Sequence, residues 1–264
     1  MVSEGIVISR QDKTETFMGL FDKQVTAFRR FLDDKRRQGI VSEFPEVNDA
    51  SWPSDRNRNL VLSHDTAVEL GNPRDASTSF LMWVNEPEKV NNRQITIVGP
   101  DLPELSGRQV SFGKIVIVGA ADFDADNSYD RYRELELLRY DIHLKGYMMR
   151  GVSQQQREWS RVSVDAVSGG FSFKHLGQAL IAEFSQISYV RSVETVFITA
   201  SREAVLETKA IADDVFRLIS AMNKMTEELS FDCDSCDYND VCGDVAELRS
   251  MRKSIKNKER ETHA

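Results

Sequence analysis

Short runs of apolar residues, each bounded by turn-forming residues, recur through the middle of this chain. The runs densest in Ile and Val cover residues 94–98 and 114–118, as expected of strands buried on both faces. Further strands are predicted at residues 60–62, 80–84, 159–164 and 193–199. Sharp reversals are predicted at Gly71-Asn72-Pro73, Gly99-Pro100-Asp101 and Ser106-Gly107. The pattern therefore predicts a sheet of short strands.

Apolar residues spaced three and four apart predict helices on either side of these strands. The first helix covers about residues 14–38, and its apolar face carries Phe17, Phe21, Val25, Phe28 and Leu32. Two more helices are predicted at about residues 128–144 and 174–184, and the longest begins after Ser201 and ends near Leu229. Such alternation predicts an α/β or α+β fold, with a mixed sheet and flanking helices.

Changes in composition divide the chain into three expected parts. A polar, Pro-containing connector at residues 45–59 separates the first helix from the rest, so residues 1–55 are predicted to form an N-terminal helical arm. Residues 56–230 form the predicted α+β domain. Residues 231–264 form a cysteine loop and a basic tail, in which Asp244 and Glu247 have the spacing of a capping box at the start of a helix.

All three cysteines of the chain, Cys233, Cys236 and Cys242, lie in the sequence FDCDSCDYNDVCGD. The thiolate is the form that binds metal, and a C-x2-C turn can aim two sulfurs at one ion or one edge of a cluster. We expect an iron–sulfur cluster here, with zinc as the alternative. A third interpretation is that the three cysteines are free or oxidisable thiols that bind no metal. An odd number of cysteines argues against a disulfide framework.

The fourth ligand of such a centre is not evident from the sequence. It can come from an exogenous molecule, from a cysteine of another chain, or from one of the residues His64, His143, His175, His263, Asp232, Asp237 and Asp240.

A net charge of -8 argues against general nucleic-acid binding, which depends on clustered positive charge. The exception is residues 249–260, which carry six basic side chains and one acidic one. They can form a solvated helix or frayed tail, or bind an acidic partner or a phosphorylated ligand. The first residues lack a basic start followed by an apolar run, so no signal peptide is expected. The apolar runs are far shorter than the roughly 20 residues that span a bilayer. We therefore expect a cytoplasmic protein without membrane segments.

Arginines surround a tryptophan in the region of the fifth predicted strand. Arg150, Arg157, Trp159 and Arg161, named the Trp159 patch below, offer ion pairing and ring stacking to a phosphorylated, base-containing ligand. The alternative is an exposed strand edge with solvated arginines. Weaker candidates are His64 and Asp65 as a catalytic pair, although adjacent side chains point apart, and Asp122, Asp124 and Asp126, which can hold a hard cation or form a solvated acidic loop. The common dinucleotide, phosphate-loop, hydrolase and zinc-protease motifs are absent.

Five segments, in this order, resemble the β subunit of the carbon monoxide dehydrogenase/acetyl-CoA synthase complex. They are Val68-Glu-Leu-Gly-Asn-Pro73, Ile95-Thr-Ile-Val-Gly-Pro-Asp-Leu102, Trp159-Ser-Arg-Val-Ser163, Leu176-Gly-Gln-Ala179 and Val196-Phe-Ile-Thr199. The resemblance covers roughly residues 68–242, and its most specific piece is the ITIVGPDL run. It implies that residues 56–230 are similar to the α+β middle domain of that family, which faces coenzyme A. Trp159, Arg157 and Arg161 are then the residues nearest coenzyme A.

The resemblance also implies a metal site and a metabolic setting. The family joins a methyl group from a corrinoid protein, carbon monoxide and coenzyme A into acetyl-CoA, at a nickel centre attached to a 4Fe-4S cubane. Cys233, Cys236 and Cys242 then stand at the first three cubane-binding cysteines. The expected function is a cluster-binding subunit or accessory piece of such a complex, in anaerobic one-carbon metabolism, with dehydrogenase or corrinoid subunits as partners.

The sequence departs from the family pattern at the metal site. No fourth cubane cysteine follows Cys242, and the Cys-Gly-Cys segment that carries nickel is absent. Three cysteines that are committed to a cubane cannot also bridge a nickel ion, so the sequence leaves open whether this chain catalyses CO-dependent acetyl-CoA synthesis. Two alternatives remain: a stand-alone iron–sulfur or zinc protein for electron transfer or metal delivery, and an interaction protein with vestigial cysteines.

Overall fold

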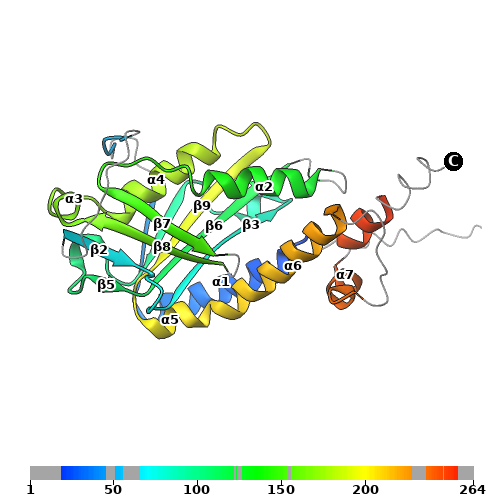
Figure 1. The fold of residues 1–264 in the computed structure, drawn as a ribbon, viewed down its shortest axis with the longest axis horizontal. Coiled ribbons are helices and arrows are strands. Elements are labelled where there is room, and N and C mark those ends of the chain that lie inside the picture. The colour runs from blue at the N-terminus through cyan, green and yellow to red at the C-terminus, as the bar shows by residue number, and fades with distance from the viewer. Residues whose placement is uncertain are drawn as a thin grey trace, which may run out of the picture.

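The computed structural model describes residues 19–45, 51–55, 66–121, 123, 127–153, 156–227, 236–245 and 247–254. Its helices are α1 (Asp22–Arg37), α2 (Ser128–Leu138), α3 (Val164–Ser168), α4 (Phe173–Phe184), α5 (Arg202–Glu207), α6 (Lys209–Glu227) and α7 (Asn239–Asp244), with the 3-10 turns η2 (Pro87–Lys89) and η3 (Leu102–Glu104). Its strands are β1 (Val41–Pro45), β2 (Ala67–Leu70), β3 (Ser77–Val84), β4 (Gln94–Val98), β5 (Gln109–Val110), β6 (Phe112–Ala120), β7 (Tyr147–Ser153), β8 (Arg157–Ser163) and β9 (Val190–Ile198). The mixed sheets and flanking helices confirm the predicted α+β fold (Figure 1).

The larger sheet has five strands in the order β1-β4-β9-β6-β3. The β4–β9 and β6–β3 pairs are parallel, whereas β1–β4 and β9–β6 are antiparallel. The two Ile- and Val-rich segments predicted from the sequence became β4 and β6, and every residue of β6 is buried. Strands covered on both faces have this continuous apolar composition.

The smaller sheet has four strands in the order β5-β2-β8-β7, and β8 lies against β3 of the larger sheet. The β2–β8 and β7–β8 pairs are antiparallel. This arrangement puts one face of β8 inside the molecule and the other toward the outside, so alternate residues of β8 have different surroundings. The candidate site is built on this strand.

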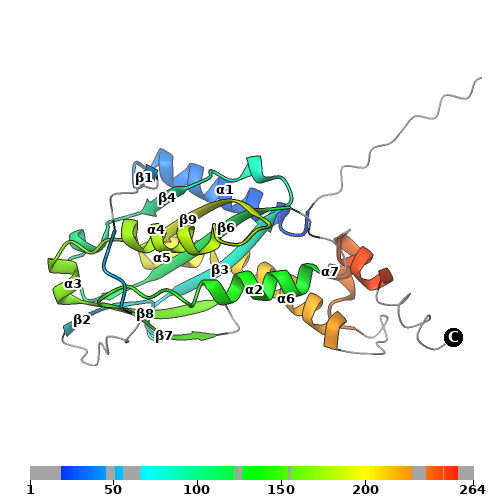
Figure 2. The ribbon, with the colours of Figure 1, turned by 90° about the horizontal axis from the view of Figure 1, so that it is seen from above.

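Helices α1, α5 and α6 pack on the outer face of the larger sheet (Figures 1 and 2). Phe28 of α1 meets Phe80 of β3 edge-on, with ring centroids 6.1 Å apart. Of the predicted apolar stripe, Val25, Phe28 and Leu32 of α1 and Phe21 just before it are buried in the core, whereas Phe17 lies outside the described residues. Helix α4 covers the opposite face, where a Cβ on Gly177 would lie 2.8 Å from a methyl group of Ile95. A glycine at that position allows the close approach of helix and sheet.

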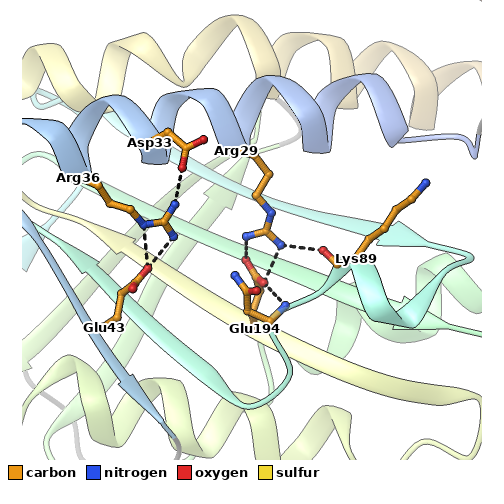
Figure 3. Close-up of polar contacts among 7 residues, drawn as sticks. Arg29, Asp33, Arg36, Glu43, Lys89 and Glu194 are labelled. Atoms are coloured by element: carbon orange, nitrogen blue, oxygen red, sulfur yellow. Dashed lines mark hydrogen bonds and ion pairs between the residues drawn. The ribbon is translucent and has the colours of Figure 1, made fainter.

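Ion pairs fix α1 on the larger sheet (Figure 3). The Arg29 guanidinium pairs with both carboxylate oxygens of Glu194 on β9 and donates to the Lys89 carbonyl at 3.1 Å. Two turns later, Arg36 donates to Glu43 of β1 at 2.6 and 3.0 Å. Because Glu194 is buried, its pairing also satisfies a charge inside the protein.

The structure agrees with most of the predicted elements and differs at several boundaries. Helix α2 ends at Leu138, earlier than the predicted residue 144, and the predicted long helix is split at Thr208 into α5 and α6. Four of the described strands were not predicted: β1 and β7, whose sequences are not apolar runs, and β2 and β5, which have only four and two residues. The predicted strand at residues 60–62 lies outside the described residues. The division into residues 1–55, 56–230 and 231–264 stays a prediction.

The C-terminal part packs at the end of α6, where α7 and the helical residues 247–254 lie (Figure 2). The expected capping role of Glu247 is wrong, because its carboxylate accepts hydrogen bonds from Leu20 N at 2.7 Å and from Asn85 Nδ2 at 2.6 Å. Asp244 is the last residue of α7. Glu247 therefore ties the C-terminal part to the turn that precedes α1.

Candidate functional site

Strand β8 separates two groups of polar side chains by simple alternation. Arg157, Trp159 and Arg161 share one face, and Glu158 and Ser160 share the other. The first group was predicted from the sequence, because the arginines flank an aromatic residue. The second group was not predicted, because nothing in the sequence alone places Glu158 beside a lysine from a distant strand.

Trp159 and Arg161 both meet Glu69, a buried residue of β2. Glu69 lies directly across the sheet from Arg161, and its Oε1 is 2.5 Å from Arg161 Nε. The indole Nε1 of Trp159 donates to the other carboxylate oxygen, Oε2. The Arg161 guanidinium also lies 5.3 Å from the centroid of the Trp159 ring. One carboxylate therefore binds two of the three residues predicted to lie nearest the ligand.

Arg150 approaches the same ring from β7. The β7–β8 register shifts between Met149 and Gly151, so Arg150 is the extra residue of a bulge, and its guanidinium lies 5.3 Å from the Trp159 ring centroid. Bulges redirect a side chain relative to a regular strand. The side chain of Arg150 is exposed, whereas that of Arg161 is buried. The structure thus brings the whole Trp159 patch together.

A pocket of about 260 Å³ opens beside Trp159. Arg157 is the arginine that lines it, and its Nη2 donates to the Asp75 carbonyl at 3.0 Å. The rest of the wall comes from the β2–β3 turn and from strands β7 and β8, through residues Gly71, Pro73, Gly151, Val152, Ser153 and Glu158. An aromatic ring and a guanidinium at the edge of one hollow can stack on a base and pair with a phosphate.

The inner face of β8 carries a buried polar network around Glu158. Its Oε2 lies 2.5 Å from Lys114 Nζ and accepts from Ser79 Oγ at 2.9 Å. Its Oε1 accepts from Ser160 Oγ at 2.8 Å and from Tyr147 Oη at 3.2 Å. Burial opposes the charged form of both partners and lowers the pKa of Lys114. For Glu158, burial would raise the pKa, but the charge and hydrogen bond of Lys114, the hydrogen bond from Ser160 and the charge of Arg139 outweigh it and hold the pKa below its ordinary value.

Two of the three cysteines are described, and they line one small pocket of about 20 Å³. Cys236 is half-buried and Cys242 is buried, and the cationic side chains of Lys224 and Arg252 line the same pocket. Cys233 lies outside the described residues, and within these residues no three His, Cys, Asp or Glu side chains are placed to hold a metal ion. The two described cysteines thus share one pocket with two cationic side chains.

The other predicted candidates have ordinary surroundings or lie outside the described residues. His143 Nε2 is 2.7 Å from Asp141 Oδ1, and Nδ1 of His175 accepts from Ser172 N at 3.1 Å as the capping side chain of α4. Asp240 pairs with Arg217 at 2.8 Å. The residues outside are His64, Asp65, Asp122, Asp124, Asp126, Asp232 and His263. Across the described helices, none has the length and apolar character needed to cross a membrane.

Fold and site together define an α+β protein with a Trp159 patch on its smaller sheet and a cysteine pocket at the end of α6. The sequence profile of the CO dehydrogenase/acetyl-CoA synthase complex beta subunit matches residues 57–205, which is more than half of the chain. The chain belongs to this family. The matched region contains β8 and the Trp159 patch and ends before the cysteines.

Individual relatives show the same similarity. The chain is 29% identical over 127 residues to the carbon monoxide dehydrogenase/acetyl-CoA synthase subunit alpha of Moorella thermoacetica, covering 48% of this chain and 17% of that protein. It is 27% identical over 162 residues to the acetyl-CoA decarbonylase/synthase complex subunit beta of Methanopyrus kandleri, with 60% and 33% covered. The beta 2 subunit of Methanosarcina acetivorans is 28% identical over 177 residues, with 65% and 36% covered. The chain thus spans only about a sixth to a third of these relatives.

Proposed function

We propose that this chain is a cluster-binding subunit or accessory piece of a CO dehydrogenase/acetyl-CoA synthase-type complex, acting in acetyl-CoA metabolism in the cytoplasm. The observation that carries the proposal is the family match over residues 57–205, followed by three cysteines in ten residues. The relatives are named as subunits of such complexes. The partners are accordingly dehydrogenase or corrinoid subunits.

Coenzyme A is the proposed ligand of the Trp159 patch. Its adenine base suits the Trp159 ring, and its phosphates suit the guanidinium groups, which pair with phosphate in a planar fork. The patch has three arginines and one buried carboxylate, which leaves an excess of positive charge beside the 260 Å³ pocket. That excess supports an anionic ligand at this surface, within a chain whose net charge is -8.

The three cysteines are proposed to bind a 4Fe-4S cluster, with zinc as the alternative. Lys224 and Arg252 line the same pocket as Cys236 and Cys242, so their positive charges would offset part of the negative charge of a thiolate-bound cluster. A bound cluster would supply one-electron transfer or an attachment point for a partner's metal centre. The proposal includes no nickel centre, because all cysteines of the sequence are assigned to the cluster.

Anaerobic purification with iron, sulfide, zinc and nickel analysis tests the cluster. We expect about four irons and four sulfides per chain, with loss of both in a Cys233→Ser/Cys236→Ser variant. Zinc alone would instead favour the stand-alone metal-delivery protein, and an absence of metal would leave an interaction protein with vestigial cysteines.

Calorimetric titration with coenzyme A tests the ligand. Trp159→Ala should weaken binding, whereas Arg37→Ala, which changes an exposed arginine at the end of α1, should leave it unchanged. Equal binding by both variants would refute the assignment of coenzyme A to the Trp159 patch. Co-purification of dehydrogenase or corrinoid subunits with the tagged chain tests the proposed partners.

A further inference from the structure

Glu69 is a buried carboxylate that contacts two residues of the Trp159 patch, and nothing in the sequence around Glu69 indicates these contacts. Its side chain has no exposed surface, although the neighbouring Trp159 is only half-buried. Each carboxylate oxygen has a different partner: Oε2 accepts from the indole of Trp159, and Oε1 faces Nε of Arg161. A buried charge costs several kcal/mol unless it is paired, so this arrangement holds both partners in place.

The same pairing gives the arginines of the patch different roles. Arg161 is 10% exposed, ion-paired with Glu69, and does not line the 260 Å³ pocket. Arg157 lines the pocket and uses one of its five donors on the Asp75 carbonyl. Arg150 is exposed and is the extra residue of the β7 bulge, and its guanidinium lies 5.3 Å from the centroid of the Trp159 ring.

We infer that Glu69 is the positioning residue of this site: it orients Trp159 and neutralises Arg161, so that Arg157 and Arg150 are the cations that meet the ligand's phosphate groups. The inference rests on the proposed coenzyme A function for its ligand. It departs from the expectation drawn from the sequence, in which Arg157 and Arg161 had the same role. The strand alternation puts both on one face, and only the cross-strand position of Glu69 distinguishes them.

Glu69→Gln separates these roles with little change of volume. A carboxamide has a single acceptor oxygen, so the new side chain can accept from Trp159 or from Arg161, and its NH2 group then faces the other donor. In the double variant Glu69→Gln/Arg161→Gln, the carboxamide at position 69 can accept from the Trp159 indole and donate to the carboxamide at position 161, and neither charge remains. Because the double variant carries no buried unpaired charge, it also serves if the single variant does not fold.

Nuclear magnetic resonance of the ligand-free protein tests the positioning directly. The indole Nε1–H signal of Trp159, assigned with Trp159→Phe, should exchange slowly with solvent in the wild type. The double variant Glu69→Gln/Arg161→Gln should keep slow exchange, whereas Glu69→Leu/Arg161→Leu, which has no acceptor oxygen and no buried charge at this place, should increase the exchange rate. An unchanged signal in Glu69→Leu/Arg161→Leu would overturn the inference, whether or not coenzyme A binds.

Titration with coenzyme A tests whether Arg157, and not Arg161, contacts the ligand. Ordering one side chain on binding corresponds to about a tenfold change in affinity, so Glu69→Gln should bind about tenfold more weakly. The double variant should recover wild-type affinity, and Arg157→Gln should lose affinity together with part of the salt dependence. A double variant as weak as Arg157→Gln would show that Arg161 contacts the ligand and would overturn the inference. No binding by the wild type would refute the proposed function instead, while the indole exchange would still decide the role of Glu69.

Discussion

Replacement of Lys114 by methionine should destabilise the protein strongly, because it removes the cation that faces a buried carboxylate. Both Lys114 and Glu158 have fully buried side chains, and Nζ lies 2.5 Å from Oε2. Removing one partner of a buried pair costs about 3–5 kcal/mol, since the other charge stays buried without compensation. The loss should lie near the lower limit, because hydrogen bonds from Ser79, Ser160 and Tyr147 remain and the nearby positive charge of Arg139 also stabilises the Glu158 carboxylate.

Urea unfolding followed by circular dichroism measures this loss, and the chain offers a matched control. Lys209 pairs with Asp213 at 2.7 Å on the surface of α6, where both side chains are more than half exposed. Lys209→Met should therefore cost less than about 1 kcal/mol. If Lys114→Met and Lys209→Met lose the same small amount, the argument from burial is refuted.

The pH dependence of stability gives a second test of the same pair. In the wild type the pKa of Glu158 lies below its ordinary value of 4.5. Its contribution to stability is thus fully present above pH 4.5 and is lost as the pH falls through the folded-state pKa. In Lys114→Met the Lys114 charge, which lowers the pKa of Glu158, is gone, and burial raises this pKa. Protonation of Glu158 as the pH falls toward 4.5 then removes the free-energy cost of its buried, unpaired charge. The stability difference between variant and wild type should therefore shrink from about pH 7 toward pH 4.5, and a constant difference would contradict this assignment.

Three further predictions concern other parts of the molecule. Cys233→Ser/Cys236→Ser should abolish iron and sulfide binding and leave the thermal unfolding transition of the α+β domain in place; loss of that transition would exclude a separable cysteine loop. Gly71→Ala should cost about 2 kcal/mol or more in urea unfolding, because φ is +63° and a Cβ would lie 2.4 Å from a backbone carbonyl oxygen. Arg29→Ala should cost about 2–3 kcal/mol by the same measurement, since buried Glu194 loses a bidentate partner, and an unchanged midpoint would show that the Arg29–Glu194 pair does not stabilise the protein.

The strands that the sequence predicted share one property. Residues 94–98 and 114–118 are covered on both faces, so burial selects Ile and Val at nearly every position and the signal is local. Strands β1 and β7 were not predicted, because they lack this burial on both faces. Their residues are mostly exposed or half-buried, so backbone pairing with a neighbouring strand, and not composition, makes them strands.

The candidate sites divide in the same way. The sequence alone predicted an α/β or α+β fold, the clustering of the cysteines, and a local patch of Arg157, Trp159 and Arg161, because each depends on residues close together in the chain. Only the tertiary structure decided that Glu69 lies opposite Arg161 and that Lys114 faces Glu158. The physical reason is that strand pairing and sheet packing bring distant residues into contact, and a buried charge then acquires its role from the partner that the fold supplies.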